Sequence, residues 1–437
     1  MSTKDDNGKM KNIGRRDAIK AASAIAAGAG VASVLGWSNL AFAEASIIKI
    51  GFVTPKTGPL APFAEADAFV IEEMRKLFAG GLDIGGTKHK VEIIVKDSAS
   101  NPGRASDVAK DLILKDKIDL MLVASTPETT NPVSDQCELY KKPCISTVAP
   151  WQPWFFARGG KPEKGFEWTY HFFWGLEDII AVFTGMWKSV KTNGVVGGLW
   201  PNDGDGNAWG DGKMGFPAAF AKDGLKVVDP GRYQNLTSDF SAQIAKYKEG
   251  NVEILTGVPI PPDFTTFWNQ AAQKGFRPKI ASVGKALLFP SSVEALGTNG
   301  EGLSTEVWWT PSHPFKSSLT GQSAQSLAAA YETGTKKQWT QPLGFSHALF
   351  EIAVDVLKRT KNLGSAASIR DAVAATNLAT IVGPVNWGTG PMKNVSKTPL
   401  VGGQWRKGGK FKYQLLIVDN SLAKNIPVQD TLKPIGG

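Results

Sequence analysis

The sequence has few of the side chains that most often bind transition metals. Two cysteines and four histidines occur among its 437 residues. The histidines are widely separated along the chain, at His89, His171, His313 and His347. A structural zinc site needs four cysteine or histidine ligands that lie close together. The sequence therefore predicts no metal site, and it contains no recognisable cofactor motif.

The chain also lacks the short motifs of common enzymes, such as a nucleophile elbow, a phosphate loop or a zinc-protease helix. One near match, Asp203-Gly204-Asp205-Gly206-Asn207, begins like a calcium-binding loop. It fails at Ala208, where that loop needs glycine, and at Met214, where it needs a bidentate glutamate. We therefore expect no enzymatic activity and no bound calcium.

Basic blocks are absent as well, although the formal net charge is +9. The first 20 residues carry six lysines and arginines against three aspartates, which leaves a net charge of +6 on the remainder. That remainder shows no basic run and no basic helix face, which nucleic-acid-binding proteins usually have. The sequence therefore predicts no nucleic-acid partner.

Beyond the start of the chain, no apolar run approaches the length of a membrane span. The start itself has the pattern of a targeting segment, with Arg15-Arg16-Asp17-Ala18-Ile19-Lys20 before an Ala/Gly-rich run over residues 21–35. The paired arginines resemble a twin-arginine export signal. Small residues at Ala41 and Ala43 suit a signal peptidase. We expect cleavage near Ala43 and a soluble mature protein that begins near Glu44.

Strand and helix patterns alternate in the first third of the mature chain. Strands are predicted over residues 47–53, 91–95, 119–123 and 144–147. Helices are predicted between them, over residues 63–78, 104–115 and 128–140. Single helices between strands indicate βαβ units with a parallel sheet and right-handed crossovers.

The alternation breaks over residues 151–174, a stretch rich in Trp, Phe, Gly and Pro, and then resumes. The second series has predicted strands over residues 194–200, 226–228, 254–258 and 280–283. Helices near residues 325–335, 345–359 and 367–375 and a strand over 411–418 complete the chain. This pattern predicts an α/β fold with two doubly wound parallel-sheet lobes around a central cleft, where the carboxyl ends of such strands bind ligands.

Short motifs occur in a definite order along the whole mature chain: IGFVTPKTGP at residues 50–59, Asp97-Ser98, Asn101-Pro102, Ser125-Thr126, PCIST at 143–147, Asp239-Phe240 and GLST at 302–305. Their order and spacing resemble the leucine/isoleucine/valine-binding family of type I periplasmic binding proteins. The resemblance implies two lobes joined by three crossovers, closure on a small ligand, and delivery to the membrane permease of an ABC importer. It also implies a monomer in the periplasm.

The resemblance and the periodicity together divide the chain into five segments. We expect a signal peptide over residues 1–43, a first lobe over 44–172 and a second lobe over 173–303. The chain would then return to the first lobe over residues 304–380. Residues 381–437 would form a C-terminal segment that belongs to the second lobe and the hinge.

The ligand contacts of the family map onto individual residues of this sequence. On the first lobe they correspond to Phe63, Ser125, Thr126, Val148, Ala149, Pro150 and Trp151. Ser125 and Thr126 lie at a helix start, whose free N–H groups favour a carboxylate or carbonyl oxygen, although the same residues also suit a plain N-cap. On the second lobe the contacts correspond to Trp209, Val258, Pro259 and Lys285.

Two of these positions depart from the amino-acid-binding members of the family. Pro150 stands where they have a threonine that holds the α-carboxylate, and Lys285 lies near their acidic residue for the α-ammonium. The departures imply a different small organic solute, such as an aromatic or other carboxylate, with Lys285 opposite its charge. A solvent-facing Lys285 on the cleft rim, a branched-chain amino acid or a small amide remain alternatives. Other classes that remain are an envelope hydrolase and a sensory ligand-binding subunit.

Tryptophan is abundant, with 14 residues in the chain. Six of them crowd the predicted joint and cleft loops: Trp151, Trp154, Trp168, Trp174, Trp200 and Trp209. Such rings stack on planar ligands and attract cations, but they also pack joints between lobes. The sequence leaves open which of the six contact a ligand.

The two cysteines, Cys137 and Cys144, are seven residues apart. In an oxidising compartment they could form a disulfide. The spacing alone does not fix the Cα separation that a disulfide requires, so a pair of free thiols is the equal alternative.

The twin-arginine assignment leads to a direct test. Because the export receptor reads the paired guanidinium groups, replacing Arg15 and Arg16 together by lysine should block export while leaving the charge unchanged. Fractionation of cells that express the double variant should find precursor in the cytoplasm. Mature protein in the envelope at the normal level would contradict the assignment, and replacing Lys9 and Lys11 by arginine is the control.

Overall fold

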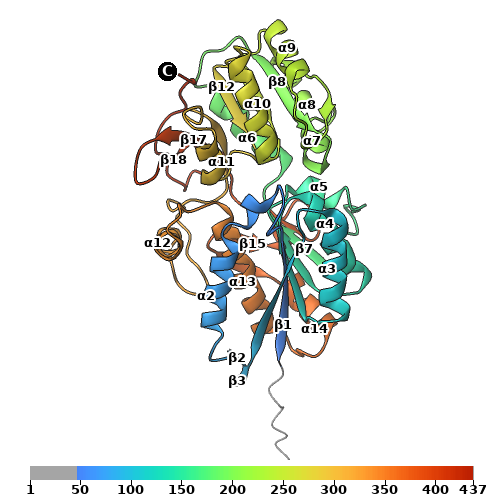
Figure 1. Cartoon of the computed structure of the whole chain (residues 1–437). Coiled ribbons are helices and arrows are strands. Elements are labelled where there is room, and N and C mark those ends of the chain that lie inside the picture. The colour runs from blue at the N-terminus through green and yellow to red at the C-terminus, as the bar shows by residue number, and fades with distance from the viewer. Residues whose placement is uncertain (1–46, 437) are drawn as a thin grey trace, which may run out of the picture. The chain divides into compact units, whose positions relative to one another are not determined.

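The computed structural model describes residues 47–436, which fall within one compact unit, Ala45–Gly437. The predicted signal peptide, its arginine pair and the expected cleavage near Ala43 lie outside the described residues. Within the described part, the chain forms two α/β lobes (Figure 1). No helix in residues 47–436 is both long and apolar enough to cross a membrane.

The first lobe is built on a six-stranded sheet with the order β16-β7-β6-β5-β1-β4, and every pairing in it is parallel. Side chains alternate along strand β1 (Ile48–Thr54), so that Ile50 and Phe52 enter one apolar cluster and Val53 the other. The strands are β1 (Ile48–Thr54), β4 (Val91–Asp97), β5 (Leu120–Ala124), β6 (Cys144–Thr147), β7 (Thr169–Phe172) and β16 (Val395–Ser396).

Helices cover both faces of this sheet. One face carries α2 (Asp67–Leu77) and α13 (Pro342–Arg359), and the other carries α3 (Pro102–Leu114) and α4 (Pro127–Leu139) (Figure 1). Helix α3 begins at Pro102, two residues before the predicted start at 104, because Asn101 accepts a hydrogen bond from the Arg104 amide and Pro102 fits the first turn. The lobe also contains η1 (Ala61–Ala64), α5 (Trp151–Phe155), α12 (Ala324–Thr335), α14 (Ala366–Ala374) and η2 (Trp387–Thr389).

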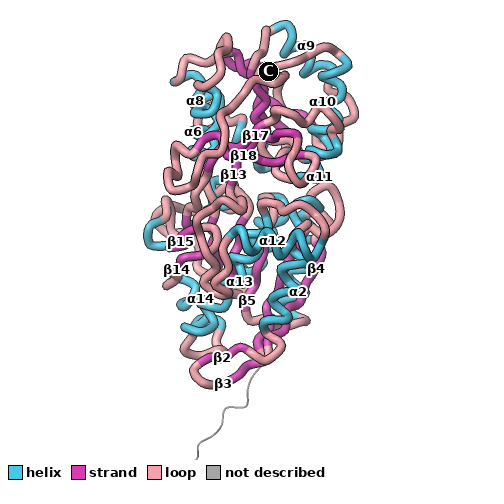
Figure 2. The backbone as a smooth tube through the Cα atoms, turned by 90° about the vertical axis from the view of Figure 1, so that its left-hand side faces the viewer, coloured by secondary structure: helices cyan, strands magenta, loops and turns pink. Residues whose placement is uncertain are grey.

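Two small antiparallel pairs complete the first lobe. Strands β2 (Leu82–Ile84) and β3 (Thr87–His89) form a hairpin, and so do β14 (Asn377–Thr380) and β15 (Gly383–Asn386). The β2–β3 hairpin lies at the end of the lobe that is remote from the second lobe (Figure 2).

The second lobe has an eight-stranded sheet with the order β10-β8-β11-β12-β13-β17-β18, in which β9 also pairs with β8. The pairings from β10 to β13 are parallel, whereas β13–β17 and β17–β18 are antiparallel. The strands are β8 (Val195–Pro201), β9 (Lys226–Val228), β10 (Arg232–Tyr233), β11 (Ile254–Gly257), β12 (Ile280–Val283), β13 (Ser304–Val307), β17 (Val401–Lys407) and β18 (Tyr413–Asp419).

Helices again cover both faces of the second sheet. Apolar side chains of α6 (Leu176–Trp187), α7 (Gly204–Trp209) and α8 (Phe216–Lys222) join one cluster. Those of α9 (Ser241–Glu249), α10 (Pro261–Gln273) and α11 (Pro290–Ala295) join the other. The predicted α/β fold with parallel sheets and flanking helices is therefore confirmed, while the second sheet is mixed and not purely parallel because β17 and β18 extend it in antiparallel fashion.

Sheet membership shows where the chain passes between the lobes. It crosses after β7, after β13 and between β16 and β17. Strand β13 lies beyond the boundary expected at residue 303 but still belongs to the second sheet. Strand β16 lies beyond the boundary expected at residue 380 but belongs to the first sheet, where Val395 pairs with His171. Both returns therefore occur later than expected, because short strands without clear alternation gave no signal of which sheet they join.

The two cysteines are free thiols in the structure. Cys137 lies in α4 and Cys144 in β6, and both are buried in the apolar cluster between the first sheet and α3. Burial, with a contribution from the hydrogen bond to Cys144, raises the pKa of the Cys137 thiol well above its usual range. Of the two alternatives that the spacing left open, the structure favours free thiols.

Buried thiols of raised pKa should be unreactive in the folded protein, because the thiolate is the reactive form. We expect no reaction with a thiol reagent such as DTNB at neutral pH under native conditions. In denaturant without reductant, two thiols per chain should react. Thiols that appear in denaturant only after reduction would show that the exported protein carries a disulfide instead.

Candidate functional site

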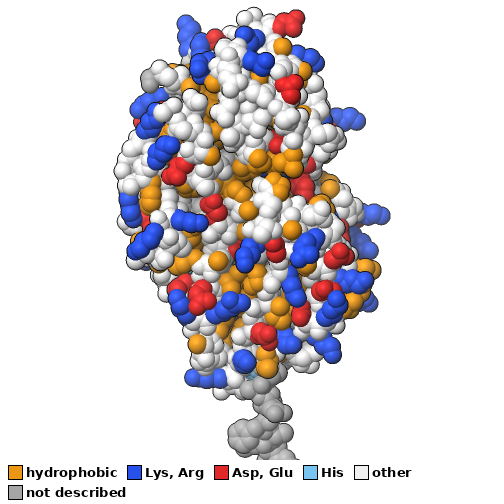
Figure 3. Space-filling view, viewed as in Figure 1, with side chains coloured by type: hydrophobic (Ala, Val, Ile, Leu, Met, Phe, Trp, Pro, Cys, Tyr) orange, Lys and Arg blue, Asp and Glu red, His pale blue; other side chains and the backbone are white. Residues whose placement is uncertain are grey.

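The carboxyl ends of the parallel strands in both sheets point toward the junction of the lobes, as open α/β sheets require of a ligand site. A small cavity lies there, with walls from both lobes. The space that the centre of a water molecule can occupy in it is about 20 Å³, so in this arrangement the lobes leave room for little more than a water molecule. On the face shown in Figure 3, hydrophobic side chains gather at this junction, and basic and acidic side chains are interspersed elsewhere.

Seven of the eleven residues that the sequence assigned to ligand binding line this cavity. They are Phe63, Thr126, Val148, Pro150, Trp209, Val258 and Lys285. They come from the loops that follow β5, β6, β11 and β12, from η1 and from the end of α7. The fold brings them together, and their contact with a ligand stays a prediction.

The other four residues, Ser125, Ala149, Trp151 and Pro259, are buried but do not line the cavity. The Ser125 hydroxyl accepts a hydrogen bond from Thr129 at 2.7 Å, so it supports the start of α4. The Trp151 indole lines a separate surface groove and donates to Glu177 at 3.2 Å. The sequence could not distinguish these four residues from those that line the cavity, because neighbouring residues in a loop point in different directions.

Ala149 is occupied by a contact within the first lobe. Its carbonyl oxygen lies 2.7 Å from Nε2 of His171, whose Nδ1 lies 2.8 Å from the Ser146 hydroxyl. The His171 ring stacks on Trp154 with centroids 4.7 Å apart. Burial lowers the pKa of His171 to about 3. His171 is therefore a neutral core histidine with satisfied hydrogen bonds and does not reach the cleft.

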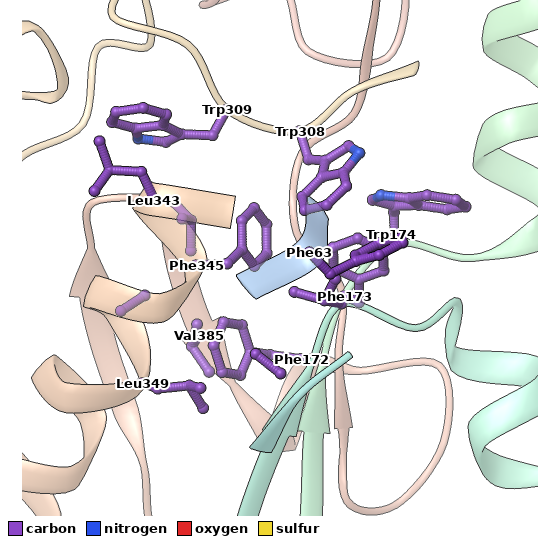
Figure 4. Packing of buried hydrophobic residues seen from close by; sticks show 14 of the residues in the cluster. Phe63, Phe172, Phe173, Trp174, Trp308, Trp309, Leu343, Phe345, Leu349 and Val385 are labelled. Carbon is purple, nitrogen blue, oxygen red and sulfur yellow. The ribbon is translucent and has the colours of Figure 1, made fainter. Parts of the chain in front are cut away.

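Six cavity residues were not assigned from the sequence: Phe173, Trp174, Asp205, Leu288, Glu306 and Trp308. Three of them lie on the crossovers, since Phe173 and Trp174 follow β7 and Trp308 follows β13. Phe173 and Trp308 pack edge to face with centroids 5.0 Å apart. Figure 4 shows Phe63, Phe173, Trp174 and Trp308 gathered at this junction. The aromatic content of residues 151–174 was the sequence signal for Phe173 and Trp174, and Asp205 appeared only in the failed calcium loop. No pattern pointed to Leu288, Glu306 or Trp308.

Direct contacts hold the two lobes together around the cavity. Oε1 of Glu128, at the start of α4 in the first lobe, accepts a hydrogen bond from the Gly204 amide of the second lobe at 3.0 Å. Phe63 packs edge to face on Phe289 with centroids 4.8 Å apart. The Ser291 hydroxyl donates to the Glu65 carboxylate across the same junction. The structure is thus a closed arrangement of the lobes.

Lys285 lies at the centre of a buried cluster of carboxylates. Its Nζ is 2.8 Å from Asp205 Oδ2, 3.3 Å from Asp203 Oδ2 and 3.7 Å from Glu128 Oε2. The Lys285 side chain is only 3% exposed. Burial alone would lower its pKa, but the three carboxylates raise it above the usual range. The expectation that Lys285 offers a free counter-charge to an anionic ligand is therefore wrong, because acidic side chains already surround its ammonium group.

Two carboxyl groups of the cavity wall resist ionisation. Burial raises the pKa of Asp205 to about 7, although Lys285 opposes the shift. Burial likewise raises the pKa of Glu306 to about 8, although hydrogen bonds from Thr305 and the Lys285 amide favour its charged form. Perturbed groups of this kind are typical of functional clefts.

Several buried polar atoms of the wall have no hydrogen-bond partner within the protein. They are Oγ1 of Thr126, Oδ1 of Asp205 and the indole nitrogens of Trp174, Trp209 and Trp308. Each residue lines the same cavity. A buried polar group without a partner costs about 1–3 kcal/mol. A ligand with both donors and acceptors would satisfy these atoms.

Two wall residues adopt the left-handed backbone conformation that glycine usually occupies. Val148 has φ 74° and Lys285 has φ 58°. Positive φ is strained for a β-branched residue such as valine, and strain of this kind concentrates at ligand sites. Val148 directly follows β6, and Lys285 follows β12 after Gly284. Both residues line the cavity, so these turns bring their side chains to its wall. In residues 47–436, no group of three or more His, Cys, Asp or Glu side chains is arranged to hold a metal ion.

Two doubly wound lobes, three crossovers and an enclosed cavity between strand ends define a two-lobed ligand-binding protein. A family model described as periplasmic binding protein matches residues 47–410. The chain therefore belongs to the periplasmic binding protein family, whose members are solute-binding receptors. The family name places its members in the periplasm. No curated protein matches the sequence.

Solved structures show the same fold at low sequence identity. LivJ, a branched-chain amino acid transporter protein of Streptococcus pneumoniae solved with isoleucine, is 15% identical, with 85% of this chain and 99% of that chain covered and a TM-score of 0.67. The leucine-binding protein LivK of Thermotoga maritima is 18% identical, with 86% and 99% covered and a TM-score of 0.68. An ABC-transporter solute-binding protein of Rhodopseudomonas palustris, solved with 3,4-dihydroxybenzoic acid, is 18% identical, with 88% and 98% covered and a TM-score of 0.67.

The Lys285 cluster predicts a large effect on stability. Lys285→Met leaves the buried side chains of Asp203 and Asp205, and the partly exposed Glu128, without their cation. The loss should lower the free energy of unfolding by about 3–5 kcal/mol at pH 8. The deficit should shrink as the pH falls, because protonation of the carboxyl groups removes the unpaired charge. Urea unfolding at two pH values measures both effects.

The matched control is Lys248→Met, which removes an exposed lysine of the same lobe and should change stability by less than about 0.5 kcal/mol. Equal stability of the two variants at pH 8 would show that the Lys285 ion pairs do not exist in solution.

Proposed function

We propose that this protein is the substrate-binding component of an ABC importer, and that it captures a small organic solute by closure of its two lobes. One observation carries the proposal: the enclosed cavity takes its walls from both lobes and holds five buried polar atoms without protein partners. A ligand that satisfies these atoms contacts both lobes at once, so it stabilises the closed form over the open one.

The crossovers supply the means of opening. Three segments connect the lobes within residues 47–436, so rotation about them would open the cavity without disrupting either sheet. Opening would separate Glu128 from Gly204 and Lys285, and Phe63 from Phe289. These contacts are individually modest and re-form on closure. The closed surface that they create is what a membrane permease would recognise in our proposal.

The chemical identity of the ligand rests on other observations than the receptor role does. Pro150 immediately precedes α5 as its N-cap and offers no hydroxyl, so this difference from the amino-acid-binding members of the family remains. The sequence first suggested an aromatic or other carboxylate as the ligand. That interpretation relied on Lys285 as the opposite charge, and Lys285 is already paired with three carboxylates. The relatives solved with isoleucine and with 3,4-dihydroxybenzoic acid support an amino acid or an aromatic acid as alternatives, and a small amide also fits the mixed donors and acceptors.

The location and the downstream partner are part of the same proposal. Export through the twin-arginine route with cleavage near Ala43 would place a soluble monomer in the periplasm, where a membrane permease can meet it. A receptor of this kind releases its ligand unchanged, which separates it from a hydrolase that uses the same cleft.

Binding at the cavity can be tested with a single hydroxyl. Thr126→Val removes the unpartnered Oγ1 atom while keeping the side-chain shape, so it should leave the melting temperature of the free protein nearly unchanged. It should weaken binding of the captured solute by about 0.5–1.5 kcal/mol, the usual worth of one hydrogen bond. A thermal-shift screen of carboxylates, amino acids, amides and amines finds the solute, because a ligand at a hundred times its Kd adds about 2.7 kcal/mol.

The control is Thr340→Val, since the Thr340 hydroxyl is also buried and unpartnered but lies outside this cavity. Calorimetry should find its affinity equal to that of the unaltered protein. Loss of affinity in Thr340→Val alone would place the ligand elsewhere. Conversion of the bound compound to a product during incubation would replace the receptor proposal with an enzyme.

A further inference from the structure

The charges around the cavity do not balance. Four carboxyl groups lie in its wall or against its lysine: Glu128, Asp203, Asp205 and Glu306. Lys285 is the one basic side chain among the residues that line the cavity. The start of helix α4 adds about half a positive charge. At neutral pH burial leaves Glu306 mainly protonated and Asp205 partly protonated. The excess negative charge, which Glu128 and Asp203 share, therefore grows as these two groups ionise at higher pH.

On the basis of the proposed receptor function, we propose that the group enclosed in this cavity is a small organic cation of the ammonium or guanidinium type. An enclosed cation would neutralise part of the excess negative charge, which burial otherwise makes unfavourable. An enclosed anion would add to that charge. The carboxylate interpretation of the sequence rested on a free Lys285, and the three carboxylates around Nζ remove that basis.

The aromatic part of the wall fits the same chemistry. Phe63, Phe173, Trp174, Trp209 and Trp308 all line the cavity. Indole and phenyl faces attract cations through their quadrupoles, most strongly where water is excluded. Neither Lys285 nor an arginine forms a cation–π contact with any of these five rings among the described residues. Their faces are thus not engaged by cationic side chains.

The unpartnered atoms supply specific hydrogen bonds. Oδ1 of Asp205 is buried and has no donor, while Oδ2 of the same carboxyl group is 2.8 Å from Lys285 Nζ. Oδ1 is therefore positioned to accept from an ammonium or guanidinium N–H. The indole N–H groups of Trp174, Trp209 and Trp308 are donors only, so they suit an acceptor atom, such as a hydroxyl oxygen, elsewhere on the same ligand.

The protonation of the wall gives a second, independent signature. Burial raises the pKa of Asp205 to about 7 and that of Glu306 to about 8. A neutral ligand adds no charge that would change these values. An adjacent cation favours the ionised form and lowers both pKa values. The ratio of cation affinity to neutral affinity should therefore rise between about pH 6 and about pH 9. The charged groups that face these two carboxyls are Glu128 on α4, Asp203 and Asp205 at α7, Lys285 after β12 and Glu306 on β13.

Isosteric probes isolate the charge of the ligand from its shape. Guanidinium and urea are planar and nearly equal in size, and choline and 3,3-dimethylbutan-1-ol differ mainly in the charged nitrogen. Titration calorimetry of the mature protein should find the cation of at least one pair bound about tenfold more tightly, a difference of about 1.4 kcal/mol. The anion 3,3-dimethylbutanoate should bind most weakly of the second set.

Two variants connect that preference to the wall. Glu306→Gln keeps the acceptor for the Lys285 amide and removes the ionisable group, so it should remove most of the cation preference while leaving the neutral probe unchanged. Asp205→Asn should act in the same direction and serves if Glu306→Gln is unstable. Glu249→Gln, an exposed glutamate of the same lobe, is the matched control and should retain the preference.

The outcomes separate this inference from the receptor proposal. Equal or tighter binding of the neutral or anionic probe would overturn the inference. Tight binding of leucine, 3,4-dihydroxybenzoate or acetamide, without binding of either cation, would also overturn the inference. In that case the receptor proposal would still stand. Failure of every compound to stabilise the protein would count against both.

Discussion

A parallel sheet places the carboxyl ends of all its strands at one edge, and this constraint determines where the protein can bind anything. Two such edges face each other here, and the three crossovers leave the sheets from those same edges. Phe173, Trp174 and Trp308 lie on the crossovers and also form walls of the cavity. The segments that connect the lobes are therefore the segments that a ligand contacts, so lobe movement and ligand contact involve the same residues.

The buried ion cluster adds an electrostatic condition to this geometry. Asp203 accepts a hydrogen bond from the Gly206 amide at the start of α7 and an ion pair from Lys285, while Glu128 reaches the cluster from the other lobe. Removing such charges from water is costly unless opposite charges compensate. Closure brings Glu128 toward Lys285, but it also encloses Asp205 and Glu306. The lysine compensates one negative charge, and the remainder grows as Asp205 and Glu306 ionise. The closed state therefore favours a ligand that reduces this remaining charge.

The sequence was most informative where local pattern determines structure. Phe63, Thr126 and Trp209 could be placed at the cavity because the family resemblance maps a ligand contact onto each of them. Trp308 and Glu306 could not, since β13 is too short to show which sheet it joins or which way its side chains point. The acidic pair Asp203 and Asp205 drew notice only as a failed calcium loop. Its partner Lys285 is 82 residues further along, and no periodicity connects residues across such a distance.

The sequence alone suggested an anionic ligand, whereas the structure supports a cationic one. The difference arises from the side chains that surround Lys285. A lysine near the position of a family acid suggests an anionic ligand if the lysine is considered alone. The net field in a cavity depends on every charge within a few ångströms, and in a desolvated site each counts more than it would in water. Lys285 is held by three carboxylates at 2.8–3.7 Å, and Glu306 in the cavity wall is a fourth acidic group close by. The substitution of lysine for an acid therefore does not reverse the charge of the site, because other acids of the fold surround the lysine.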